Sequence, residues 1–435
     1  MLEAAALGLA FLVFVWPQFA SSWEAALRYR DGAPAEYNNI PSWLESAQCA
    51  RKTGAWAALC RDEGMAPLLA DDPGHAILLG YWTRLADRDV TTVDAARLNL
   101  LINAAGLIVL AATMLMLGRF WTALILLWLG PPVFLVWFGA AAHWSFIGVL
   151  SMHLALPLGV VMWGTRLTSR GVSAVLIVSG LPLLGFAALI REPIGWMSLF
   201  VTLAAIGAMA IRGLNRRDVL ALSAVGLLAV LASQTAQISM AVRDAMYRMD
   251  TSHAVATHGI SHNLYVGLGV VENRFGITYD DKLALDTARK AVPGTQDYSK
   301  EYFRIIRHLY FARVLEDPVE VVRIYAAKLG IFLGQRILDA APPLWMFLAI
   351  VLGIQAIALK SLPLGGDRRA TFLRLSINAV SAGFVGFFVL QGVLAHPSRF
   401  FAAPVGACML VMTGMAAEQL AGLARLALRY LPRPR

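Results

Sequence analysis

The chain has 435 residues, of which 58% are hydrophobic and only 15% are charged. Because soluble domains carry about a quarter charged residues, this composition excludes an ordinary soluble protein. It predicts instead that a bilayer solvates much of the apolar surface. The net charge of +9 is explained by basic loops at a membrane surface, so we expect no nucleic-acid partner.

Stretches free of Asp, Glu, Lys and Arg define the predicted spans, since a transmembrane helix needs about 20 apolar residues. The first separates Glu3 from Glu24, and because no basic residue precedes it we interpret it as a retained helix and not a cleaved signal. The stretch between Arg119 and Arg166 is long enough for two helices, with a turn near His143. The other stretches are 97–119, 170–191, 192–212, 218–243, 339–360, 374–399 and 399–418.

Basic residues mark every second connection between these stretches, as the positive-inside rule expects of cytoplasmic loops. This alternation predicts cytoplasmic termini and places two long hydrophilic segments on the outer face. The chain then divides into an N-terminal transmembrane module (1–242, including the first outer loop, 21–96), a second extracytoplasmic segment (243–339) and C-terminal transmembrane helices (340–435).

Amphipathic helices are predicted in the second outer segment. Apolar side chains recur there at helical spacing, at Tyr302, Ile305, Ile306, Leu309 and Tyr310. Asp317-Pro318 has the residue types of an N-cap and a first helical position, so a further helix carrying Lys328 and Arg336 is expected to begin there. The predicted fold is an all-α integral membrane protein with about ten transmembrane helices and two long extracytoplasmic segments that contain amphipathic helices.

Cys49 and Cys60 lie in the first outer segment. In an oxidising compartment they can form a small-loop disulfide, and the alternative is a pair of free thiols. No cysteine or histidine spacing in the chain is that of a zinc site.

Asp71 and Asp72 form an acidic pair just before a helical pattern that starts near Ile77. Such a pair is commonly a solvated helix cap. Because the chain returns to the membrane soon afterwards, a carboxylate held here can also remove a proton from an acceptor hydroxyl.

Arg191-Glu192-Pro193 forms a tight outer turn between two predicted spans. One interpretation is an interfacial ion pair in which Arg191 reaches to water. The other is a site in which Arg191 binds a phosphate and Glu192 orients the phosphate or the acceptor.

Histidines gather in the second outer segment, at His253, His258 and His262, close to Tyr265. No carboxylate or cysteine stands at a typical ligand interval from them. A polar wall that contacts sugar hydroxyls or a phosphate is therefore favoured over a metal site, and no metal or other cofactor is expected.

The turn between the last two predicted spans contains His396 and Arg399. A basic residue at an outer interface can anchor the protein to lipid headgroups or bind a lipid-linked phosphate. The same two interpretations apply to Lys328 and Arg336.

The layout of the whole chain resembles the GT-C class of membrane glycosyltransferases, especially its bacterial mannosyltransferase-like and aminoarabinose-transferase-like members. Three short motifs carry the resemblance: the acidic pair followed by residues 95–99 (AARLN), the Arg-containing turn 190–195 (IREPIG) and the segment 396–404 (HPSRFFAAP). One feature departs from the family, because the turn in which many members have a second acidic residue offers His143 and Trp144 here.

The resemblance implies a polyprenyl-phosphate sugar as donor, a hydroxyl of a glycan, lipid or protein as acceptor, and membrane lipids around the donor tail. Asp71 or Asp72 would be the catalytic base of an inverting transfer. Arg191, Lys328 or Arg399 would stabilise the leaving phosphate. The other substrate-binding candidates are Glu192, His143, His258, His262, Tyr265, Arg336 and His396.

The implied location is a bacterial cytoplasmic (inner) membrane, with the active site on its outer face. A transporter or flippase is the first alternative, and it would be expected to carry ionisable groups inside its spans and inverted repeats. An O-antigen ligase or polymerase, which shares the lipid-linked donor, and a non-catalytic relative of the transferases are the others.

Overall fold

The computed structural model describes residues 2–30, 39–62, 64–68, 73–139, 142–249, 260–337, 342–360, 368–398 and 402–430. These residues are almost entirely helical, and their strands, β1 (Ala58–Arg61) and β2 (Gly64–Pro67), form one antiparallel hairpin. The predicted all-α class is confirmed for this part of the chain.

Six described helical segments are long and apolar enough to cross a membrane. The first runs through α1 (Leu2–Ala10), η1 (Phe11–Val15), α2 (Trp16–Ala25) and η2 (Ala26–Tyr29). The others are α5 (Thr92–Met116), α8 followed by α9 (Phe146–His153 and Ala155–Thr165), α10 (Arg170–Ile190), α11 (Glu192–Ile211) and α19 (Arg368–Leu394). The pair α12 (Arg216–Ser233) and α13 (Thr235–Tyr247), bent by 52°, makes a seventh if it is one span.

Three other helices coincide with predicted spans but have shorter apolar portions, of 10–17 residues. They are α6 (Phe120–Leu129), α18 (Leu344–Lys360) and α21 (Val405–Tyr430). α6 is short because Pro131 and Pro132 begin a separate turn of helix, α7 (Pro131–Phe134). The described helices of sufficient length are thus fewer than the predicted ten or so, since a charge-free stretch counts residues whereas a span needs unbroken apolar helix.

The first outer segment folds as α3 (Asn39–Thr53), the hairpin and α4 (Pro73–Ala86). A disulfide joins Cys49 on α3 to Cys60 on β1, with the two Cα atoms 5.2 Å apart. Of the two alternatives for this pair, the disulfide is confirmed and the free thiols are wrong.

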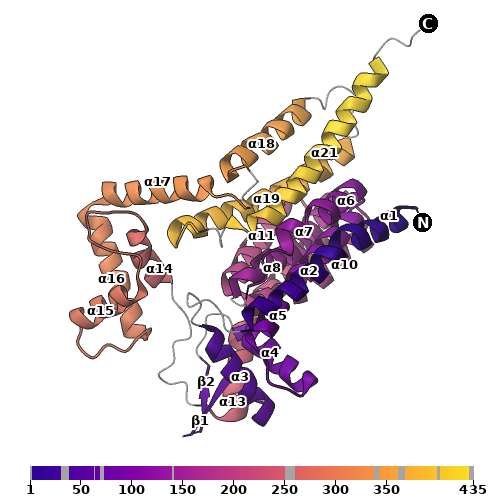
Figure 1. The fold of residues 1–435 in the computed structure, drawn as a ribbon. Coiled ribbons are helices and arrows are strands. Elements are labelled where there is room, and N and C mark those ends of the chain that lie inside the picture. Colours follow the sequence, from indigo (N-terminus) through magenta and orange to yellow (C-terminus); the bar gives the residue numbers. More distant parts are fainter. Residues whose placement is uncertain are drawn as a thin grey trace.

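The second outer segment has its own hydrophobic core, to which Tyr265, Tyr302, Ile306 and Ile324 contribute. Its elements are α14 (Ile260–Gly267), η4 (Leu268–Val270), α15 (Asp281–Ala291), α16 (Lys300–Glu316) and α17 (Pro318–Gly334). We call residues 260–334 the outer module, after the side of the membrane predicted for them. In Figure 1 it projects from the helix bundle on α17, with α14, α15 and α16 on one side of that helix.

The helix start predicted at Asp317-Pro318 is confirmed, but the predicted extent of that helix is not. Asp317 caps α17 by accepting a hydrogen bond from the Glu320 N–H at 3.0 Å. α17 ends at Gly334, and Gln335 is extended, so the prediction that this helix carries Arg336 is wrong. Two glycines close to its end, Gly330 and Gly334, lower its helix propensity there.

Two of the spans touch backbone to backbone. A Cβ atom on Gly106 of α5 would lie 2.4 Å from the Gly148 Cα, and one on Gly148 of α8 would lie 2.4 Å from the Ile102 carbonyl oxygen. Small residues at such crossings let membrane helices approach closely where no hydrophobic effect drives their association. This contact fixes the start of α8 against α5, next to the site described below.

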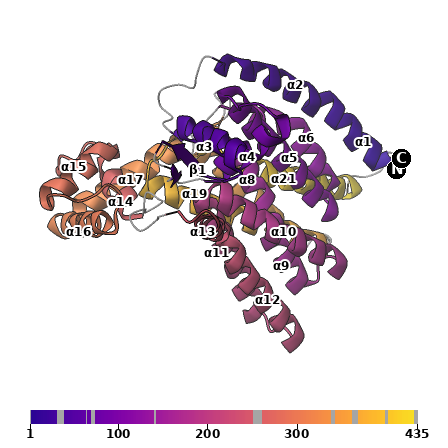
Figure 2. The same ribbon diagram turned by 90° about the horizontal axis from the view of Figure 1, so that it is seen from below.

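The connections between spans gather at two opposite ends of the bundle. At one end Asp218 pairs with both Arg166 and Arg170, and Arg369 donates to the Leu167 carbonyl at 3.0 Å. These are the connections predicted to be basic and cytoplasmic. The hairpin and the outer module lie at the other end (Figure 1), and α12 projects from the bundle when it is viewed from below (Figure 2). Which end faces the cytoplasm stays a prediction.

Candidate functional site

The start of α4 is packed against the turn between α10 and α11. A Cβ atom on Gly74 would lie 2.6 Å from the Leu189 carbonyl oxygen and 2.8 Å from the Ile190 Cδ1 atom, so only glycine permits this approach. Asp71 and Asp72 lie outside the described residues, and the helix that was predicted to follow them begins at Pro73. The start of α4, which follows the acidic pair in the sequence, thus lies against the turn that carries Arg191.

His75, in the first turn of α4, is completely buried at this contact. Its Nε2 atom lies 2.9 Å from Oδ1 of Asn99, and its ring stacks on Trp43 with the ring centres 4.9 Å apart. The Asn99 amide nitrogen donates to the Gly139 carbonyl, so its oxygen accepts and the imidazole carries its hydrogen on Nε2. Nδ1 has no hydrogen-bond partner among the described residues.

Burial lowers the pKa of His75 to about 4, against the effect of its hydrogen bond to Asn99, and the positive charge of Arg191 lowers it further. The ring is therefore neutral at physiological pH. Sequence reasoning passed over His75, although it stands within the same segment as the acidic pair.

Asn99 and Asn103, one helical turn apart on α5, hold the loop between α7 and α8. Asn99 bonds to Gly139, and the Asn103 amide nitrogen donates to the carbonyls of Trp137 and Trp144. The Asn103 oxygen accepts from the Gly148 N–H at 2.9 Å. Two asparagines on one face of an apolar span are the signal that could have revealed this role, because an amide inside a membrane needs partners.

Arg191 and Glu192 point to different neighbours. The Arg191 guanidinium carbon lies 4.7 Å from the centre of the Phe146 ring, a cation–π contact at the start of α8. Glu192 accepts hydrogen bonds from Gln237 on α13 at 2.8 Å and from Trp196 at 3.3 Å. Glu192 therefore ties the α10–α11 turn to α13.

His143 lies in η3 (Ala142–Ser145), the short helix that leads into α8. The same short helix reaches His75, because Ser145 Oγ is 3.5 Å from the His75 Nε2 atom. The start of α4, the turn at Arg191 and the start of α8 are thus brought together at one place, which we call the α4 site. Polar groups of three separate segments meet there.

Lys328 occupies a different place, the junction of α17 with the end of α19. It is fully buried, and its ammonium donates to the carbonyls of Gly267 at 2.9 Å, Ala395 at 2.8 Å and Leu394 at 3.2 Å. Gly267 ends α14 and Leu394 ends α19, so one cation caps two helix C-termini. An ammonium has three N–H groups, and all three are used here, so none is left for a phosphate in this arrangement.

Burial lowers the pKa of Lys328 to about 7. His396 lies beside it, and burial followed by the charge of Lys328 lowers its pKa as well. The His396 ring packs on Tyr279 with the ring centres 4.5 Å apart. Arg399 lies outside the described residues, and Arg336 is exposed just after α17.

His262 and Tyr265 are buried inside the outer module and do not form a wall that faces a substrate. The two ring nitrogens of His262 contact the Tyr302 hydroxyl and, at 2.9 Å, the Asp281 carboxylate. The bonds link α14, α15 and α16, and burial raises the pKa of Tyr302. His253 and His258 lie outside the described residues. In the part of the chain that is described, no three His, Cys, Asp or Glu side chains come together as metal ligands.

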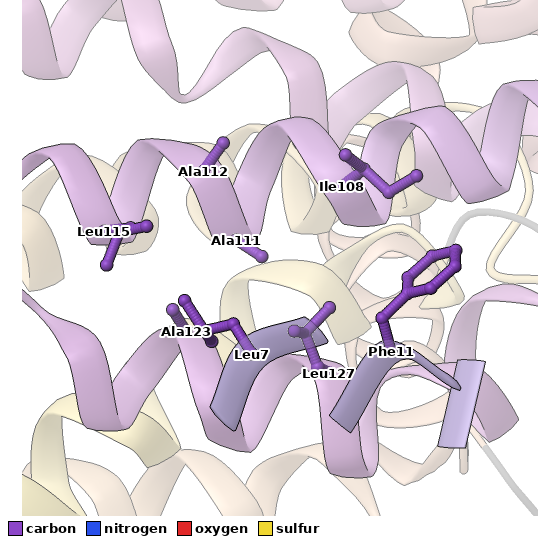
Figure 3. Close-up of a pocket in the computed structure, with 8 residues that line it drawn as sticks. All are labelled: Leu7, Phe11, Ile108, Ala111, Ala112, Leu115, Ala123 and Leu127. Carbon is purple, nitrogen blue, oxygen red and sulfur yellow. The ribbon is translucent and has the colours of Figure 1, made fainter. Parts of the chain in front are cut away.

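An apolar groove lies between the first helix, the C-terminal half of α5, and α6 (Figure 3). Its lining is Leu7, Phe11, Ile108, Ala111, Ala112, Leu115, Ala123 and Leu127. With no polar side chain it cannot do acid–base chemistry, and its surface suits a hydrocarbon chain.

The α4 site is therefore the best candidate for chemistry, because it combines buried polar groups, a cation and a chain segment that leads to an acidic pair. Comparison of the chain with protein-family models, with curated proteins and with solved structures found no match.

Proposed function

We propose that this protein is a glycosyltransferase of the GT-C type, which moves a sugar from a polyprenyl-phosphate donor to an acceptor hydroxyl at the outer membrane face. One observation carries the proposal: Gly74, two residues after the acidic pair in the sequence, is packed against Leu189 and Ile190 beside the Arg191 turn. These are two of the three segments on which the resemblance to the family rests.

The chemistry of the α4 site fits this reaction. Asp71 or Asp72 acts as the base that takes the proton from the acceptor hydroxyl. Arg191 balances the negative charge that develops on the departing phosphate. The oxygen of the acceptor attacks the anomeric carbon while the bond to phosphate breaks, so the configuration at that carbon is inverted. In this scheme α6, α18 and α21 complete about ten spans, both termini are cytoplasmic, and the membrane is the inner membrane of a bacterium.

Sugar transfer by the purified protein in lipid nanodiscs tests the proposal, with a panel of polyprenyl-phosphate sugars as donors. Loss of the base should lower turnover by about 100-fold or more in either Asp71→Ala or Asp72→Ala. Asp62→Ala, an exposed carboxylate in the hairpin turn of the same loop, is the matched control and should transfer normally. Normal transfer by both test variants would show that neither aspartate is the base.

A transporter or flippase is a second candidate, because polar side chains are buried inside the spans. His153 is 1% exposed, and both of its ring nitrogens lack a hydrogen-bond partner among the described residues. Asn378 and Ser381 on α19 are buried in the same way. Polar groups inside a membrane commonly mark a substrate path. Movement of a fluorescent polyprenyl-phosphate across proteoliposomes, without sugar transfer, would favour this candidate.

A further inference from the structure

The helix α17 is apolar on two opposite faces. One face, with Val321, Ile324 and Phe332, is buried against the outer module and α19. On the opposite face Val319 is 76% exposed and Val322 is 67% exposed. A helix that faces water on one side is normally polar on that side, so this second face does not have the character of a water-facing surface.

The second face carries almost no charge. The exposed positions of α17 are 318, 319, 322, 323, 326, 329, 330, 331 and 334, and only Arg323 among them is ionisable. Arg323 is paired with Glu320 at 2.6 Å, so its charge is largely balanced within the helix. The surface that α17 turns outward is therefore apolar along its length.

The preceding helix, α16, changes character toward the same corner. Its exposed residues are polar over the first half, at Lys300, Glu301, Arg304, Arg307 and His308, and mainly apolar near the end, where the exposed Glu316 is paired with Arg313. Phe311 is 53% exposed and Leu315 is 83% exposed. The apolar surface is thus confined to the corner where α16 meets α17, and the rest of α16 is suited to water.

This surface continues into that of the spans. Phe332 packs onto Gly392, where a Cβ atom would lie 2.3 Å from its ring, while Lys328 bonds to Leu394 and Ala395. Later residues of α17 contact earlier residues at the end of α19, so α17 runs antiparallel to that end of the span. In Figure 1 the rest of the outer module lies on one side of α17, and none of the described helices and strands lies over its opposite side. Exposed apolar residues follow at the same end of the spans, with Leu390 51% exposed and Trp345 55% exposed.

We propose that the corner formed by Phe311, Leu315, Val319, Val322 and Leu329 is inserted among the acyl chains of the outer leaflet. Lipid is the occupant because the surface is continuous with the apolar surface of the membrane-spanning helices. At the start of α17 Arg274, whose side chain is 81% exposed, pairs with Asp317 at 3.6 Å, and an exposed basic side chain beside the corner can also bind headgroup phosphates. The corner then fixes the height of the outer module above the bilayer. This inference does not depend on the proposed transferase activity.

Single cysteines that carry an environment-sensitive fluorophore test the inference in phosphatidylcholine–phosphatidylglycerol nanodiscs. Val319→Cys and Val322→Cys probe the corner, and Arg304→Cys on the charged part of α16 is the matched control. The background is Cys408→Ala, which removes the buried free thiol and leaves the Cys49–Cys60 disulfide intact. Emission is measured with nitroxide on the lipid acyl chains and, separately, with aqueous iodide.

The labels at 319 and 322 should lose most of their emission to the acyl-chain nitroxide and little to iodide, whereas the label at 304 should behave in the opposite way. Strong quenching of 319 and 322 by iodide alone would overturn the inference. So would resistance of both labels to both quenchers, since that would mean that protein, and not lipid, covers the face.

Discussion

Replacing Lys328 by methionine should loosen the attachment of the outer module without unfolding the spans. The substitution keeps the length of the side chain but leaves the carbonyls of Gly267, Leu394 and Ala395 without their donor. A hydrogen bond to a charged group contributes about 1.5–3 kcal/mol. The ammonium is also buried, and its pKa falls from 10.5 to about 7, so the three bonds offset only part of the cost of its desolvation.

Leaving one buried acceptor without its donor costs about 1–3 kcal/mol, which corresponds to roughly a 5- to 150-fold change in a local opening equilibrium. Hydrogen–deuterium exchange of the amides at the ends of α14 and α19 should accelerate by that factor in Lys328→Met. The middle of α5 should exchange as slowly as before. Lys290→Met, an exposed lysine of the same module, is the control. Unchanged exchange at both helix ends would refute the idea that Lys328 holds them together.

The same lysine predicts a pH dependence. Its pKa is about 7 in the folded protein, against 10.5 for an ordinary solvent-exposed lysine, so between these limits the unfolded chain binds more protons. The free energy of unfolding should therefore rise with pH across this window in the wild type relative to Lys328→Met, by at most about 1.4 kcal/mol per pH unit. Thermal unfolding of both proteins at pH 7 and pH 9 measures the difference, and a difference that shrinks toward pH 9 would contradict the argument.

Other parts of the chain give three further predictions. The pKa of His75 is lowered to about 4, so between about pH 6.5 and 4 the unfolded chain binds more protons than the folded chain. Thermal stability should therefore decrease as the pH is lowered through this range, and His75→Gln should remove much of this decrease. Cys49→Ser with Cys60→Ser should destabilise the hairpin by about 3 kcal/mol, seen as faster proteolysis of the first outer loop. Gly148→Ala should destabilise the bundle by about 1–3 kcal/mol through its clash with α5, whereas Gly207→Ala, which has open space around it, should leave the melting temperature unchanged.

Local patterns predicted most of the helices in this protein. The charge-free stretches place α5, α10, α11 and α19 correctly, because the absence of charge over a span's length is itself the physical requirement for crossing a bilayer. The cap at Asp317 was equally visible, since an N-cap needs only its own helix. Structural features that depend only on the residues of one segment, such as a span or a helix cap, can be predicted from that segment.

The roles of Lys328 and His262 could not be predicted in this way. The sequence offered Lys328 as a phosphate ligand, but its acceptors at Leu394 and Ala395 are 66 and 67 positions away. His262 is buried because Tyr302 and Asp281 complete its hydrogen bonds. A basic or aromatic residue in a hydrophilic segment has the same local signature whether its partner is a ligand or a distant backbone carbonyl.

Asn99 and Asn103 are intermediate between features that can be predicted from local sequence and features that depend on distant partners. Their partners, the carbonyls of Gly139, Trp137 and Trp144, lie 34 to 41 positions away and no pattern names them. Yet two amides on one face of a span cannot remain without partners in hydrocarbon, so this pair could have indicated that something polar must cover that face. The acceptors Trp137 and Gly139 lie in the non-helical stretch that follows α7. Because an unbonded polar group in hydrocarbon costs free energy, two asparagines within a span indicate that a polar segment from elsewhere in the chain contacts them. In this protein that segment is the loop between α7 and α8, which contributes to the α4 site.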